Sequence, residues 1–197
     1  YKGIVSQPDP EKKPDFLAGL IAMRKMQIHA MEESGLTAAD EMLYPENWPY
    51  VSDLLSYVAI GARSVEDQQH RLACSGFDVP AGMKNPTSGD LSVMLNSVYA
   101  AQHAHSFIFR GYEVKTSGND LTHTVLRGAN KHGQNLPNYH YEDLNTLLSL
   151  YGERDLKNPA CVIDTNHSNS NKKFEQQIRI AKEVMHSRKL SADIHSL

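Results

Sequence analysis

The chain has 197 residues, of which 40% are hydrophobic and 22% charged, so it is long enough for one globular domain with a sizeable core. Its 20 basic and 23 acidic residues give a net charge of -3, which excludes a general attraction for nucleic acid or an acidic membrane. Only Cys74 and Cys161 carry thiols, and the sequence has no apolar run of about 18 residues and no signal-type amino terminus. These features favour a cytoplasmic protein without a disulfide framework.

The first part of the chain predicts a loop, a long helix and two strands. Residues 1–14 contain three prolines and several charges, which is typical of an exposed loop. Residues 15–33 space their apolar side chains at helical intervals and predict a helix. A strand is expected at residues 37–43, and a short helix at 51–57 leads into a second strand at 58–60.

The middle of the chain continues this alternation of strands and helices. Residues 64–75 begin with a capping-box pattern and predict a helix, and residues 79–85 predict the third strand. A further helix is expected at 88–102. Residues 105–116 have β-forming residues on both sides of a glycine, which indicates an inserted hairpin, and residues 122–127 predict the fourth strand.

The last part adds one more strand and two helices. Residues 128–138 are expected to form a polar loop and residues 141–151 a helix. A strand at 160–164 runs into a polar segment, and its helix follows at 172–186 with Phe174, Ile178, Ala181 and Met185 on one stripe. The remainder to residue 197 lacks a pattern.

The order of elements predicts an α/β fold with parallel strands and right-handed crossovers. The five strand-helix units predict a single, partial domain of the (β/α)8 TIM-barrel class over residues 1–197, with the hairpin inserted at about 105–116. A complete barrel normally needs about 250 residues, so this one is short by roughly three strands. An open doubly wound sheet is the competing topology, but no Gly-x-Gly-x-x-Gly follows a strand to support a dinucleotide-binding version.

Three cations, Arg63, Lys84 and Arg127, stand at the carboxyl ends of predicted strands. Since the carboxyl ends of parallel strands share one edge, we expect these side chains to converge on a phosphorylated or carboxylated small molecule. Each cation taken alone is more simply a surface or salt-bridge residue, and only the repeated position favours a site.

Other residues of this edge allow two interpretations each. Lys84 is either an anion-binding cation or a Schiff-base lysine of the class I aldolase kind. His167 follows the last predicted strand and is either a metal ligand or a hydrogen-bonded strand-end residue. Glu41, in the first strand, must be paired if it is buried, and is otherwise a solvated strand-end residue.

Five motifs in fixed order resemble those of class I 3-deoxy-D-arabino-heptulosonate 7-phosphate (DAHP) synthases. They are GAR at 61–63, GMKN at 82–85, TSGN at 116–119, LRG at 126–128 and IDTNHSNSNK at 163–172. The resemblance extends from residue 1 to about residue 187. It implies a (β/α)8 barrel that condenses phosphoenolpyruvate with erythrose 4-phosphate and water, giving DAHP and phosphate in the first step of the shikimate pathway.

The resemblance also implies a role for each residue of the predicted edge. Arg63 and Arg127 would hold the phosphate of phosphoenolpyruvate, and Ala62 would add a backbone contact. Lys84 would contact the same substrate, and Glu41 would lie beside it near a reacting water.

The resemblance further implies a divalent metal ion of the Mn, Fe, Co or Zn class, with His167 as one ligand. The family's other ligands are a cysteine expected before residue 1 and a glutamate and an aspartate expected after residue 197. The Lys-Pro-Arg-Thr segment, the first two barrel strands and the last are also expected outside this sequence. We therefore expect this polypeptide alone to lack turnover, either binding phosphoenolpyruvate without catalysis or not binding it.

The family resemblance suggests partners beyond the two substrates. An aromatic amino acid effector is expected in some members, and the hairpin at 105–115 is either part of such an effector site or a decoration of the barrel. A homo-oligomer is expected because an incomplete barrel leaves two sheet edges unpaired.

Overall fold

The computed structural model describes residues 3–197 and contains a parallel five-stranded sheet in the order β1-β2-β3-β6-β9. The strands are β1 Ala38–Glu41, β2 Leu55–Ile60, β3 Ala81–Lys84, β6 His123–Leu126 and β9 Cys161–Ile163. Each strand of the sheet pairs with the one that precedes it in the chain, which is the order found in a (β/α)8 barrel. Within the described residues the sheet does not close, and β1 and β9 are its edges.

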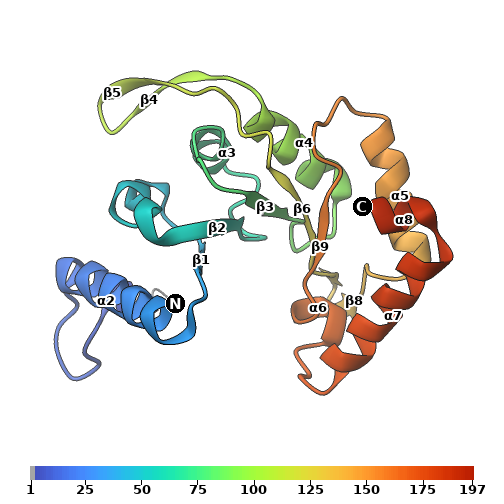
Figure 1. Cartoon of the computed structure of the whole chain (residues 1–197), viewed down its shortest axis with the longest axis horizontal. Coiled ribbons are helices and arrows are strands. Elements are labelled where there is room, and N and C mark those ends of the chain that lie inside the picture. The colour runs from blue at the N-terminus through green and yellow to red at the C-terminus, as the bar shows by residue number, and fades with distance from the viewer. Residues whose placement is uncertain (1–2) are drawn as a thin grey trace.

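Helices follow the strands and form an arc around the outer side of the sheet (Figure 1). The helices are α1 Gly3–Ser6, α2 Phe16–Ser34, α3 Gln68–Cys74, α4 Leu91–Gln102, α5 Tyr141–Gly152, α6 His167–Ser170, α7 Gln176–Leu190 and α8 Ala192–Ser196, with 3-10 turns η1 Pro45–Tyr50 and η2 Ser52–Leu54. Three helices begin at an aspartate, Asp15, Asp67 or Asp90, whose carboxylate accepts a backbone N–H of the first turn. Among the described helices, none is both long and apolar enough to cross a membrane.

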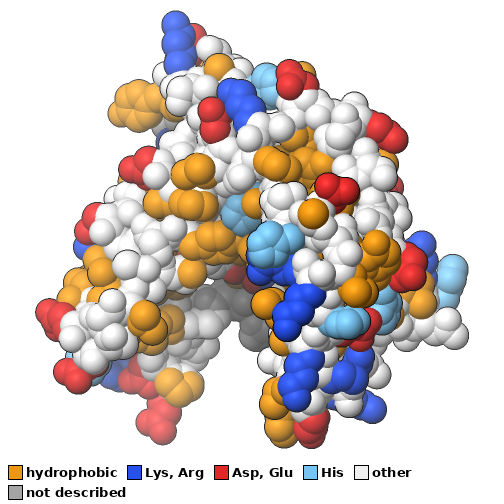
Figure 2. All heavy atoms as spheres, turned by 45° about the vertical axis from the view of Figure 1, so that its right-hand side comes forward, with side chains coloured by type: hydrophobic (Ala, Val, Ile, Leu, Met, Phe, Trp, Pro, Cys, Tyr) orange, Lys and Arg blue, Asp and Glu red, His pale blue; other side chains and the backbone are white. Residues whose placement is uncertain are grey.

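The two faces of the sheet differ in burial. Val58, Ile60 and Met83 point to the outer face and are fully buried against the helices. The inner face is more open: Ala59 is half-buried and Val162 is 44% exposed, although His123 and Val125 on this face are buried. Figure 2 shows the molecule hollowed on this open side. Parallel sheets are normally covered on both faces, so the inner face is the unusual feature of this fold.

The predicted hairpin at 105–116 is confirmed. Strands β4 Ser106–Phe109 and β5 Tyr112–Lys115 pair in antiparallel register and project from the body of the molecule (Figure 1). The turn residues Arg110 and Gly111 both have positive φ, of 54° and 82°, as a two-residue turn of type I′ requires.

The expected polar loop at 128–138 is wrong. Strands β7 Ala129–Lys131 and β8 Gln134–Leu136 form a second short hairpin there. Its turn residues His132 and Gly133 again have positive φ. No apolar alternation signals these strands in the sequence, because both lie largely exposed.

Other element boundaries also differ from the predictions. The capping box at Ser64 is wrong, since residues 61–67 form turns and α3 begins after Asp67, which accepts the N–H of His70 at 3.2 Å. The expected helix at 51–57 is instead the turn η2 followed by an earlier start of β2.

The two ends of the chain contain more helix than predicted. The loop at 1–14 includes the single turn α1, while residues 1 and 2 lie outside the described part. The polar segment after β9 contains α6, α7 continues to Leu190, and α8 follows. Short helices of four or five residues give no periodic pattern that a sequence could reveal.

Candidate anion-binding site at the strand ends

Four charged side chains lie at or just after the carboxyl ends of the parallel strands. Glu41 ends β1 and Lys84 ends β3, while Arg127 and Asp164 directly follow β6 and β9. Because the strands are parallel, these four positions lie together at the carboxyl end of the sheet.

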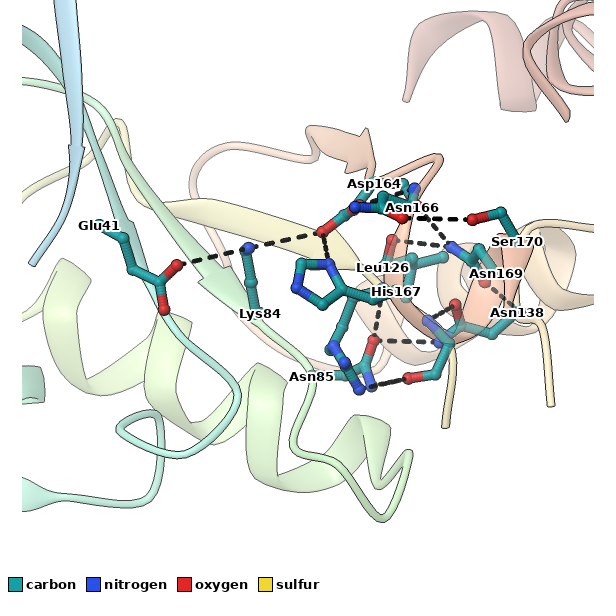
Figure 3. Close-up of polar contacts among 12 residues, drawn as sticks. Glu41, Lys84, Asn85, Leu126, Asn138, Asp164, Asn166, His167, Asn169 and Ser170 are labelled. Atoms are coloured by element: carbon teal, nitrogen blue, oxygen red, sulfur yellow. Dashed lines mark hydrogen bonds and ion pairs between the residues drawn. The ribbon is translucent and has the colours of Figure 1, made fainter. Parts of the chain in front are cut away.

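Lys84 is ion-paired on both sides. Its Nζ atom lies 3.4 Å from Oδ2 of Asp164 and 4.0 Å from Oε2 of Glu41, and its side chain is only 14% exposed. Figure 3 shows these contacts as one line that continues from Asp164 to His167. The ammonium group therefore joins both edge strands of the sheet through the central strand β3.

Asp164 stays ionised in spite of its burial. Loss of hydration alone would raise the pKa of its carboxyl, but the backbone N–H of Asn166 and the neighbouring His167 and Lys84 hold this pKa below its usual value. The Asp164 carboxylate can thus pair with Lys84 and His167 at once.

One of these partners is the imidazole of His167. Its Nδ1 atom lies 2.7 Å from Oδ2 of Asp164, and its backbone has a positive φ of 45°, which is rare for a residue other than glycine. In the described residues the Nε2 atom has no hydrogen-bond partner. A carboxylate on one ring nitrogen orients the imidazole and leaves the other nitrogen for a ligand.

Arg127 is a buried cation whose donors are largely unused. The residue is 9% exposed, and within the described chain its guanidinium makes a single long hydrogen bond of 3.5 Å, from Nη1 to the carbonyl of Gly128. Burial lowers the pKa of Arg127, and the charges of Asp164 and Glu41 oppose that change. Since a guanidinium has five N–H donors, most of those of Arg127 are left without a partner among the described residues.

Ala62 and Arg63 lie in the turn after β2. Ala62 is half-buried and Arg63 is exposed, and the Arg63 side chain makes no ion pair or hydrogen bond within the described residues. The carboxylate of Glu41 lies so close to Gly61 that a side chain at this glycine would overlap it. The structure thus brings Lys84, Arg127 and His167 around Asp164, and places the GAR turn next to Glu41.

Comparison with known proteins identifies the family. The model of the DAHP synthetase I family matches residues 12–197. The chain belongs to this family. Among its relatives, it is 34% identical over 190 residues to the Tyr-sensitive phospho-2-dehydro-3-deoxyheptonate aldolase of Escherichia coli, covering 94% of this chain and 51% of that protein. It is 36% identical over 187 residues to the phenylalanine-inhibited enzyme of Saccharomyces cerevisiae, covering 92% and 50%.

A solved structure extends the likeness to the fold. The phospho-2-dehydro-3-deoxyheptonate aldolase of Francisella tularensis superposes with a TM-score of 0.88 at 30% identity, covering 98% of this chain and 56% of that one. The DAHP synthetase I chain described here therefore spans about half the length of the relatives it matches.

The family implies a divalent metal ion, but the described residues supply too few donor side chains to hold one. The Nε2 atom of His167 suits a metal, but the described residues contain no group of three histidine, cysteine, aspartate or glutamate side chains that could hold one. Zinc and manganese sites need three or four protein ligands. These residues of the DAHP synthetase I chain do not form a metal centre by themselves.

The sequence prediction missed two kinds of residue in this site. Asp164 lies within the IDTNH motif, and its position at a strand end three residues before His167 could have indicated it. Three asparagines from segments far apart in the sequence hydrogen-bond the backbone around Arg127: Asn85 bonds Arg127, Asn138 bonds Gly128 and Asn169 bonds Leu126. No local pattern signals their contact.

Proposed function

We propose that this chain carries the phosphoenolpyruvate-binding part of a DAHP synthase. The reaction condenses phosphoenolpyruvate with erythrose 4-phosphate and water, giving DAHP and phosphate. The observation that carries the proposal is the buried Arg127 guanidinium with unused donors, which feels the charges of Asp164 and Glu41, the two carboxylates that also pair with Lys84. Membership of the DAHP synthetase I family and the names of the relatives support this choice of anion.

Each site residue has a proposed part in binding the substrate. Arg127 donates to the phosphate in a forked arrangement, and Lys84 neutralises the same anion as a point charge. Arg63 is exposed and free to turn toward the phosphate, and Ala62 offers its backbone. Glu41 lies at the same edge and is proposed to hold the reacting water.

These roles serve the condensation of the two substrates. Carbon 3 of phosphoenolpyruvate attacks the aldehyde carbon of erythrose 4-phosphate, water adds to carbon 2, and phosphate leaves. The cations hold the enol phosphate in one orientation and offset its charge, which lowers the barrier by positioning. His167 is proposed as one ligand of a divalent metal of the Mn, Fe, Co or Zn class, for which the described residues supply no complete site.

The geometry favours this role of Lys84 over a Schiff base. Its ion pairs with Asp164 and Glu41 use the ammonium form, whereas a Schiff-base lysine attacks as the neutral amine. Borohydride reduction in the presence of erythrose 4-phosphate, whose aldehyde is the carbonyl that a Schiff base needs, should leave Lys84 unmodified. A trapped adduct on Lys84 would support the aldolase reading instead.

Titration calorimetry with phosphoenolpyruvate tests the binding proposal. We expect Arg127→Ala to weaken binding by about tenfold or more, because a charged hydrogen-bond donor is lost, and Arg127→Lys to retain part of the affinity. Lys115→Ala, a change of an exposed cation on the hairpin, is the matched control. Equal affinities of the parent protein and Arg127→Ala would contradict the proposal.

Binding without turnover is the second candidate function, because the described residues lack a group of three metal ligands. An assay with both substrates and manganese on this polypeptide decides between the two. We expect phosphoenolpyruvate binding and no measurable DAHP. Turnover at the rate of a full-length family member would contradict the second candidate.

We also propose an aromatic amino acid effector at the base of the β4–β5 hairpin. A cavity of about 220 Å³ there is lined by aromatic residues, including Trp48, Phe77, Phe107 and Phe109. Relatives are named Tyr-sensitive, Trp-sensitive and phenylalanine-inhibited. Trp48 is the single tryptophan and stacks on Phe77, so its fluorescence should change on titration with the effector. An unchanged signal with all three aromatic amino acids would count against this site.

We also propose that the chain forms a homo-oligomer in the cytoplasm. Both cysteines are free thiols, in keeping with a reducing compartment. The unpaired edges of the sheet favour association with a second copy.

A further inference from the structure

The N–H and carbonyl groups of Arg127 and Gly128 are all hydrogen-bonded, and asparagine side chains supply the partner for three of these four groups. The N–H of Arg127 donates to Oδ1 of Asn85 at 2.9 Å, and its carbonyl accepts the N–H of Ser168 at 3.1 Å. The N–H of Gly128 donates to Oδ1 of Asn138 at 2.7 Å, and its carbonyl accepts Nδ2 of Asn85 at 3.0 Å. This pattern fixes both peptide groups.

Asn85 uses the whole hydrogen-bonding capacity of its amide. Its Oδ1 atom also accepts Nδ2 of Asn138 at 3.1 Å, and its Nδ2 atom also donates to the carbonyl of Pro86 at 2.9 Å. The residue is fully buried and directly follows Lys84 at the end of β3. A buried amide with all four bonds made has one orientation.

Asn169 extends the network to the loop that carries His167. Its Nδ2 atom donates to the carbonyls of Leu126, at 3.2 Å, and Asp164, at 2.8 Å, and its Oδ1 atom accepts the N–H of Asn138 at 3.0 Å. Figure 3 shows Asn138 and Asn169 on the side of His167 that faces away from Glu41, with Asn85 below the imidazole. The ends of β6 and β9 are thereby joined through side chains.

The turn at Gly128 leaves no room for a side chain. Its φ is 76°, and a side chain there would come within 2.8 Å of the backbone of Ser168 and Asn169. The turn after β6 therefore packs directly on α6, and any shift of one would shift the other.

We propose that Asn85, Asn138 and Asn169 are positioning residues that fix the Arg127 guanidinium relative to Lys84 and His167. This inference rests on the proposed function, since it takes Arg127 to bind the substrate phosphate. The guanidinium itself has one long hydrogen bond within the described residues, so its direction depends on the backbone that the asparagines hold. Misplacement of a binding group by a fraction of an ångström weakens binding without removing any contact residue.

The test compares Asn85→Ala and Asn138→Ala with Asn145→Ala, whose amide makes one bond within α5 at 3.0 Å to the carbonyl of Tyr141. Calorimetry gives the affinity for phosphoenolpyruvate, and amide hydrogen exchange by NMR gives the protection of the Arg127 and Gly128 N–H groups. We expect each site variant to bind on the order of tenfold more weakly, and Asn145→Ala to bind like the parent.

Amide exchange separates positioning from general loss of structure. Asn138→Ala should speed exchange at Gly128, because the acceptor of the Gly128 N–H is lost. The inference is overturned if Asn138→Ala loses this protection and still binds phosphoenolpyruvate within about twofold of the parent. Should Asn85→Ala not fold, the half-buried Asn138 decides the result.

Failure of the proposed function gives a different result. A parent protein that binds inorganic phosphate through Arg127 but not phosphoenolpyruvate overturns the proposed function, and positioning is then judged from the phosphate affinities of the same variants. A parent that binds neither anion overturns both.

Discussion

Asp40 is a carboxylate placed where its charge is unfavourable. It lies on the outer face of β1, and burial, with the neighbouring charge of Glu41, raises the pKa of its carboxyl from 3.8 to about 6. Because this pKa is higher in the folded chain, folding takes up a proton when the pH lies between 3.8 and about 6. The resulting contribution to stability is complete below about pH 4 and is lost as the pH rises through about 6.

Asp40→Asn should therefore raise the free energy of unfolding at about pH 7.5, by about 1 kcal/mol since the carboxyl is only partly buried. At about pH 4 the variant and the parent should be equally stable. Urea unfolding across this pH range provides the measurement, and Asp78→Asn, at an exposed position, is the control. A variant that is less stable than the parent at neutral pH would show that the Asp40 carboxylate is stabilising.

The site residues differ in how far the sequence could predict them. Lys84 and Arg127 were identifiable because each ends or directly follows a buried strand, and this position needs only the alternation of elements. The sequence did not predict that Asp164 pairs with Lys84, because the two residues are 80 positions apart in the chain. Arg63 lies in the expected turn, but the direction of an exposed side chain is not encoded in a local pattern.

At the level of the strands, Gly82 allows a close packing inside the sheet. Its missing side chain leaves room for the hydroxyl of Tyr57, which hydrogen-bonds Nε2 of His123 at 3.0 Å. A methyl group there would overlap this hydroxyl and come within 2.7 Å of Cγ2 of Val125. These residues lie on the inner face, where Gly82 and His123 are one layer below Lys84 and Val125.

Gly82→Ala should destabilise the fold by about 1 to 3 kcal/mol, the usual effect of overpacking. Tyr57→Phe removes the hydroxyl, so the double variant should lose less than the sum of the two single changes. Thermal or urea unfolding measures the cycle. Gly152→Ala, in α5 with open space around it, is the control and should be neutral or slightly stabilising. Strict additivity in the cycle would mean that the Tyr57 hydroxyl is not the obstacle.

The helices and strands were predictable to different degrees. The long helices α2, α4 and α5 carry caps and periodic apolar residues, and all three were expected. The apolar stripe predicted for α7 is not buried: Phe174 lies in the turn before the helix, and Ile178 and Met185 are 67% and 50% exposed, whereas Ile180 on another side is fully buried. Periodicity identifies a helix and its apolar side, but it cannot say what lies against that side.

Across the whole molecule, the stability of the sheet should fall from its centre to its edges. Strands β2, β3 and β6 are paired on both sides, whereas β1 and β9 are paired on one. A single further bond, from the N–H of Cys161 to the carbonyl of Leu197 at 3.2 Å, covers part of the β9 edge. Edge strands open locally at lower free energy than a packed core, so the two free thiols lie in regions of different stability.

The two cysteines can report this difference, because the thiolate is the reactive form. Burial raises the pKa of both thiols, that of Cys161 to about 12, so neither should react in the closed state. Cys161 lies on the edge strand and needs only local opening, whereas Cys74 is fully buried in α3. We expect Cys161 to react at least about tenfold faster with a chromogenic aromatic disulfide at about pH 8.

The single-thiol variants Cys74→Ser and Cys161→Ser separate the two rates. The rate of Cys74 should increase with urea as steeply as global unfolding does, since its exposure requires the loss of the core around α3 and α4. The rate of Cys161 should depend on urea more weakly, because opening one edge strand exposes little surface. Equal urea slopes for the two thiols would mean that β9 opens only with the whole sheet, and that the edge of this open barrel is as firmly held as its centre.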